Sequence, residues 1–144
     1  MSSFEASKHL GYLIKEVQHM LRTSMDNALR DIELTTPQYS ILSELDEFPG
    51  LSNADLARRS FVTPQTMNLI VRALEEHGLI AREPNETHGR KQDIRLTERG
   101  QKLLKRAHQA VGGIETGLFG CLSTLESKQF ESTLHKIVSS KKAK

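Results

Sequence analysis

Apolar residues recur every three or four positions through most of the chain, the spacing that places them on one face of an α-helix. Three long stretches near the ends show it: about Glu5 to Asp31, a run opening at Thr97-Glu98, and a run after Ser123. We expect terminal helices whose apolar stripes are covered by one another or by a second copy of the chain. The stripes are Leu10, Ile14, Val17, Leu21 and Ala28; Leu104, Ala107, Val111, Ile114 and Leu118; and Phe130, Leu134, Ile137 and Val138.

The middle of the chain contains three closely spaced helix-start signals. Thr35 is followed three residues later by Gln38, and Ser52 by Asp55, which is the pattern of a capping box. Thr63 precedes a proline at the first helical position, where a missing N–H costs nothing. We expect helices from about 36 to 47, from Ser52 to about 59–60, and from Thr63 to a stop at Gly78.

The second and third of these helices are joined by only about four residues, 60–63, so they must cross steeply, as in a helix-turn-helix. Met67, Ile70, Val71 and Leu74 form the expected buried face of the third helix. Two short extended runs follow, 79–82 and 93–96, with a polar segment between them that carries basic residues. A β-hairpin with a long basic tip behind a helix-turn-helix is a wing.

The predicted fold is therefore mainly α with a small β-hairpin wing. Residues 35–100 form a winged helix-turn-helix lobe, while residues 1–34 and 101–144 form dimerisation helices. The charge is uneven: residues 1–50 carry four basic and eight acidic side chains, and residues 101–144 carry eight and three. Complementary ends of this kind either pack together or are two solvated helical faces.

The amino-acid composition limits which classes of function are possible for the chain. The net charge of +2 is weak support for a nucleic-acid partner, and no apolar run has the roughly 20 residues of a membrane span. The single cysteine, Cys121, leaves no internal disulfide framework, and we expect a half-buried, inert thiol in a reducing compartment. With no export signal at the N-terminus, we expect a cytoplasmic protein that does not associate with membranes.

Four segments resemble the MarR/SlyA family of bacterial transcription regulators: 34–39 (LTTPQY), 50–59 (GLSNADLARR), 62–80, which opens with VTPQTM, and Arg90 leading into 94–100 (IRLTERG). The resemblance implies a homodimer with intertwined first and last helices and one winged helix-turn-helix per subunit. It also implies a crevice between the two parts, in which many relatives bind small aromatic or anionic effectors and release DNA.

The wing departs from the family pattern at one position. Relatives usually have Asp-x-Arg there, with the acid holding the arginine, whereas this chain has His88-Gly89-Arg90. Glu86 or Asp93 could replace the missing acid.

The spacing also predicts how the chain reads double-stranded DNA, since the first residues of a recognition helix face base edges in the major groove. Gln65, Thr66 and Asn68 are the candidates for base readout, because Gln and Asn pair with adenine through two hydrogen bonds. Arg90 and Lys91 are the candidates for the wing, with Arg90 in the minor groove. Candidate phosphate contacts are Thr63, Arg72, Arg58 and Arg95, with Arg59 and Arg82 further cations on the same lobe.

Two other functional classes compete with DNA binding. A winged-helix protein-interaction module without sequence-specific DNA binding remains an alternative, because residues 51–100 carry almost balanced charge. An enzyme is disfavoured, since the six histidines lack metal-ligand spacing and no glycine-rich phosphate loop follows a strand. We expect no catalytic site, metal or cofactor, and ordinary surface or interface roles for His9 and His19.

Overall fold

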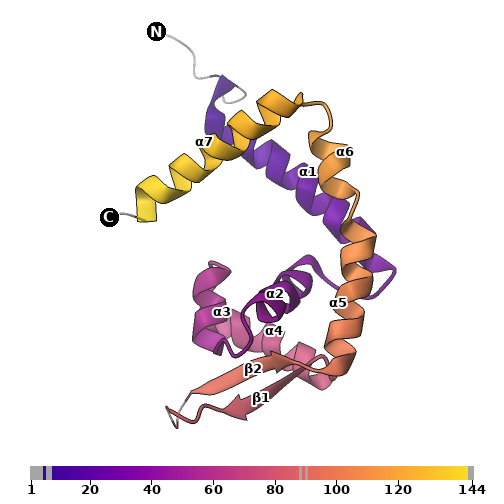
Figure 1. Cartoon of the computed structure of the whole chain (residues 1–144), viewed down its shortest axis with the longest axis vertical. Coiled ribbons are helices and arrows are strands. Elements are labelled where there is room, and N and C mark those ends of the chain that lie inside the picture. Colours follow the sequence, from indigo (N-terminus) through magenta and orange to yellow (C-terminus); the bar gives the residue numbers. More distant parts are fainter. Residues whose placement is uncertain (1–4, 6–7, 88, 90, 143–144) are drawn as a thin grey trace. The chain divides into compact units, whose positions relative to one another are not determined.

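The computed structural model describes residues 5, 8–87, 89 and 91–142 (Figure 1). Within it the chain forms two compact units, residues up to 21 with those from 113 onward, and residues 22–112. The helices are α1 (Leu10–Arg30), α2 (Thr36–Glu47), α3 (Asn53–Arg59), α4 (Pro64–Glu76), α5 (Glu98–Val111), α6 (Ile114–Phe119) and α7 (Thr124–Lys142), and the strands are β1 (Ile80–Pro84) and β2 (Gln92–Leu96).

The central unit, residues 22–112, contains the hydrophobic core. Among the described residues, fifteen apolar side chains are buried in one cluster. They come from α1, α2, α3, α4, α5, the hairpin and the connections before α2 and β1, and include Leu29, Leu56, Ile94 and Leu104. This unit is wider than the predicted lobe 35–100. The reason is that Leu29 on α1 and both Leu104 and Ala107 on α5 are buried in the same core.

The predicted helix starts of the central unit are confirmed. Thr35 and Ser52 form complete capping boxes with Gln38 and Asp55, and Thr63 caps α4 by accepting a hydrogen bond from the Thr66 N–H. Gly78 adopts φ +72°, a left-handed conformation that glycine tolerates and that ends α4. Local sequence signals therefore set the boundaries of the helix-turn-helix.

The wing is a two-stranded antiparallel hairpin with an isolated backbone bridge beside it. Ile80 pairs with Leu96 and Pro84 with Gln92, so β1 begins one residue later and ends two residues later than predicted. Leu79 is excluded because its N–H donates to Leu74 at the end of α4 and its carbonyl accepts from Thr97. The bridge joins Leu51 to Ile94 and ties the segment before α3 to β2.

The terminal unit differs from prediction at two helix boundaries. The first helix begins at Leu10 rather than about Glu5, since Lys8 N–H turns back to the Glu5 carbonyl. The run after Thr97 is two helices, because Gly112 and Gly113 interrupt it between α5 and α6. Glycine favours such a break, since it costs about 1 kcal/mol relative to alanine inside a helix.

Candidate nucleic-acid interface

Helix α4 is fixed on one face and open on the other. Met67, Val71 and Leu74 are fully buried, and Ile70, predicted beside them, is partly buried against the core. Gln65, Thr66 and Arg72 are exposed, as is Leu69 with 68% of its surface accessible. A helix held this way presents its first turn to a partner, as base readout in a major groove requires.

The N-terminus of α4 is tied to its neighbours by polar contacts. The Asn53 side-chain amide on α3 donates to the Pro64 carbonyl over 3.1 Å. The Thr63 hydroxyl accepts from the Thr66 N–H at 3.1 Å and donates to the Thr66 hydroxyl at 3.0 Å. The structure therefore gives Thr63, a predicted phosphate contact, an evident role as the N-cap of α4.

The turn between α3 and α4 contains an exposed aromatic side chain that the sequence reasoning did not single out. Phe61 is 94% exposed and has φ +58°, a left-handed conformation that is unfavourable for a residue with a side chain. Its neighbour Val62 is also partly open to solvent. These two exposed apolar side chains lie directly before the first turn of α4.

Asn68 differs from the other two predicted base contacts because it is half-buried and already has a partner. Its side-chain oxygen accepts a hydrogen bond of 3.4 Å from Arg82 on β1, which also forms an ion pair of 3.5 Å with Glu75. Arg82 therefore links the hairpin to α4 through a hydrogen bond and an ion pair. The amide NH₂ of Asn68 has no partner among the described residues and remains available to a base.

The predicted phosphate-binding cations divide into paired and unpaired side chains. Arg58 pairs with Asp55 at 2.7 Å, Arg59 with Glu44 at 2.6 Å, and Arg95 with Glu83 at 3.6 Å. Arg59 also lies over the ring of Phe48, 4.4 Å from its centroid. Arg72 and Lys91 have no ion pair within the described part of the chain, although the charge of Lys91 helps to lower the pKa of Asp55.

The base of the wing is ordered by its own polar contacts. Asn85 donates from its side-chain amide to Asp93 at 2.9 Å and accepts from the Thr87 N–H at 2.8 Å. Asp93, one predicted substitute for the missing acid, therefore already binds Asn85. Arg90 and His88 lie outside the described residues.

Histidine and cysteine side chains form no metal site among the residues described, where no group of three His, Cys, Asp or Glu comes together. Cys121 is exposed, which corrects the prediction of a half-buried thiol; α6 ends just before it and leaves its side chain open to solvent. None of the helices described is long and apolar enough to cross a membrane.

A helix-turn-helix backed by a hairpin wing places the chain in the class of winged-helix DNA-binding proteins. The model of the MarR family matches residues 32–91. The "HTH-type transcriptional repressor Rv2887" of Mycobacterium tuberculosis is 38% identical over 128 residues, covering 89% of this chain and 92% of the relative. The chain belongs to the MarR family and is a transcription regulator.

Solved structures of the same mycobacterial protein have the same fold. Its complex with salicylic acid matches with a TM-score of 0.72 at 38% identity, covering 90% of this chain and 96% of that one. Its complex with DNA matches with a TM-score of 0.75 at 36% identity, covering 90% and 97%. Both support the mainly helical winged-helix architecture found here.

Proposed function

We propose that the chain is a cytoplasmic repressor that binds a pseudo-palindromic operator as a homodimer and releases it when a small aromatic or anionic effector binds. The observation that carries this proposal is the exposed first turn of α4, whose opposite face is locked in the core. The relative with a DNA complex and a salicylic acid complex supports it.

In this proposal Gln65 makes the principal base contact. It is exposed and has no hydrogen bond within the described residues, so both its amide oxygen and nitrogen are free to pair with adenine. Thr66 lies beside it. Asn68 contributes mainly the donors of its amide NH₂, because its oxygen already accepts a hydrogen bond from Arg82.

Phosphate contacts in the proposal come from Arg72 on α4 and Lys91 on the wing. Arg58 and Arg95 must exchange their carboxylate partners for phosphate, and Arg90 enters the minor groove. Each phosphate neutralised lowers the slope of log affinity against log salt by about 0.9, so binding falls steeply as salt rises.

Fluorescence anisotropy with the DNA upstream of the chain's own gene tests this proposal, with a scrambled duplex of equal length for comparison. Gln65→Ala should weaken binding to the operator by about 1–3 kcal/mol and leave binding to the scrambled duplex unchanged. Arg72→Ala and Arg90→Ala should weaken binding to both duplexes. Lys105→Gln, which lies on α5 outside this surface, serves as the control.

The alternative class, a protein-interaction module, makes the opposite prediction for the same titration. Absence of nanomolar-to-micromolar binding at low salt, or equal affinity for the operator and the scrambled duplex in the native chain, would favour it.

A further inference from the structure

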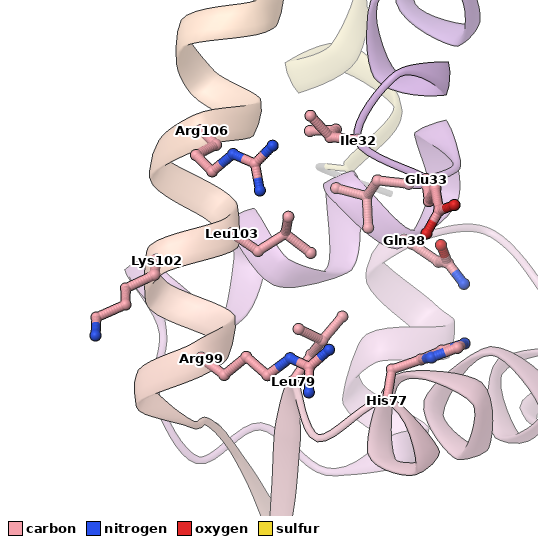
Figure 2. A pocket seen from close by; sticks show the side chains of 10 residues that line it. Ile32, Glu33, Gln38, His77, Leu79, Arg99, Lys102, Leu103 and Arg106 are labelled. Carbon is pink, nitrogen blue, oxygen red and sulfur yellow. The ribbon is translucent and has the colours of Figure 1, made fainter.

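A groove of about 510 Å³ lies within the central unit, away from the exposed first turn of α4 (Figure 2). Its walls come from α5, from the connection between α1 and α2, and from the end of α4. Ile32, Leu34, Leu79 and Leu103 supply apolar surface, and the polar lining consists of Glu33, Gln38, His77, Arg99, Lys102 and Arg106.

The cations of this groove are concentrated on one face of α5. Arg99, Lys102 and Arg106 follow the i, i+3, i+7 spacing, which aligns side chains along a helix. Arg99 and Arg106 have no ion pair or hydrogen bond among the residues described. Lys102 instead pairs with Glu98 at 3.3 Å and points away from the groove in Figure 2.

The two arginines lie at opposite ends of the groove. Seven residues separate them, which is two helical turns or roughly 10 Å along the axis. In Figure 2 the Arg106 guanidinium is turned toward Ile32 and the Arg99 guanidinium toward Leu79 and His77, while the Leu103 side chain points inward between them. The groove therefore has a positive charge at each end and an apolar middle.

The remaining polar groups limit what a ligand can be. Glu33 is the acidic side chain of the lining, on the wall opposite α5, so a third negative charge on a ligand would be repelled there. The Gln38 oxygen accepts from the Thr35 N–H at 3.1 Å, which leaves its NH₂ free to donate into the groove. A ligand that is anionic at both ends and uncharged between them pairs with both arginines and brings no further negative charge toward Glu33.

We propose that this groove is a binding site for an apolar dicarboxylate, with one carboxylate on Arg99 and the other on Arg106. The planar guanidinium group suits this task, because it donates two parallel hydrogen bonds to a carboxylate. The hydrocarbon body covers Leu103, Leu79 and Ile32. A molecule with one carboxylate, or with two that are too close together, leaves one arginine unpaired.

The groove is also connected to the DNA-binding surface through α4. His77 is the C-cap of α4, so a ligand between Arg99 and Arg106 contacts both the recognition helix and α5. Ligand and operator then alter each other's affinity by the same factor, since coupling between two sites is reciprocal. This effector role rests on the proposed operator binding, whereas ligand binding at the groove does not.

Isothermal titration calorimetry of the full chain at low salt tests the site with three probes: azelate, a long dicarboxylate; nonanoate, of equal length with one carboxylate; and succinate, a short dicarboxylate. Azelate should bind at least tenfold more tightly than the other two. Arg99→Gln and Arg106→Gln should each weaken azelate binding about tenfold or more, from the loss of charged hydrogen bonds. Lys105→Gln, the neighbouring cation on α5 outside the groove, should leave it unchanged.

Several results would overturn the proposal. These are nonanoate binding as tightly as azelate, azelate binding unaffected by Arg99→Gln, or no heat of azelate binding to a chain that binds its operator. If azelate binds as described but operator affinity is the same with and without it, the effector role is wrong and the site stands. If azelate binds and no operator is bound, the failure lies with the proposed function instead.

Discussion

Gly100 occupies a position in the fold where no other residue fits. A Cβ added there would lie 2.0 Å from the Leu79 carbonyl oxygen and 3.0 Å from its carbon. The approach is close because the Thr97 N–H donates to that same carbonyl, at the point where the wing leads into α5.

We therefore expect Gly100→Ala to lower the free energy of unfolding by about 3 kcal/mol, since the obstacle is backbone and cannot rotate away. Gly117→Ala is the matched control. It lies inside α6 with nothing within 4 Å of the added Cβ, and should raise stability by up to about 1 kcal/mol. Urea denaturation measures both, and a Gly100→Ala chain as stable as the native one would contradict the packing described.

Phe61 shows the opposite case, a side chain at a position that favours glycine. Its φ of +58° costs about 1–2 kcal/mol for an L-residue, and its ring is almost entirely exposed. Phe61→Gly should therefore raise the free energy of unfolding by about 1 kcal/mol in the same assay. Phe61→Ala keeps the Cβ and should give no such gain; a destabilised Phe61→Gly would show that the ring has contacts in the native protein.

At the scale of single elements, the short polar signals are the most reliable. Asp55 closes the capping box of α3: the Ser52 N–H donates to its carboxylate at 3.0 Å, and Arg58 donates at 2.7 Å. The Ser52 backbone N–H, followed by the Ser52 side chain, holds the pKa of Asp55 below its usual range.

A lowered pKa in the folded state makes the charged carboxylate stabilising above its ordinary pKa, and this contribution is lost as pH falls through the folded value. We expect Asp55→Asn to be less stable than the native chain at neutral pH. The difference should begin to shrink as pH drops below about 4, the ordinary pKa of an aspartate, and should be lost once pH falls below the lowered pKa of the folded carboxyl. Urea denaturation from neutral to acid pH checks this, and a difference that is constant with pH would contradict it.

How well the sequence predicts this structure depends on how far apart in the chain the interacting residues lie. Capping boxes at Thr35 and Ser52 and the stop at Gly78 depend on residues a few positions apart, so the helix-turn-helix could be placed closely. The start of β1 could not, because Leu79 is held by Leu74 and by Thr97, which is eighteen residues away. Neither could the pairing of Asn68 with Arg82, which depends on how the hairpin packs on α4.

The sequence could not predict the cationic groove, for a different reason. Its signal, Arg99, Lys102 and Arg106 on one helical face, is readable in the sequence, but such a row is usually a solvated surface. Only the apolar side chains brought alongside it, from the connection between α1 and α2 and from the connection between α4 and β1, distinguish it from such a surface.

At the scale of the whole molecule, the terminal unit has large apolar residues on its surface. On α7 these include Phe130, Leu134, Ile137 and Val138, each at least 41% exposed in the single chain. A monomer rarely leaves such a row open, so a second copy of the chain is expected to cover it.

Leu134→Glu should therefore convert a dimer into a monomer in sedimentation velocity at micromolar concentration, because a carboxylate would be buried without a partner. Operator affinity should fall at least tenfold with it. Lys136→Glu, an exposed neighbour on α7, should remain dimeric, and a dimeric Leu134→Glu chain would place the interface elsewhere.

In the proposed complex, two copies of α4 read one duplex from the same side. A hydroxyl-radical footprint of the full chain on the DNA upstream of its gene tests this arrangement. We expect two symmetric protected patches about one helical turn, roughly 10 base pairs, apart, and their loss in Gln65→Ala at the same protein concentration. A single patch, uniform protection without a boundary, or no protection at protein concentrations that saturate the anisotropy signal would contradict it.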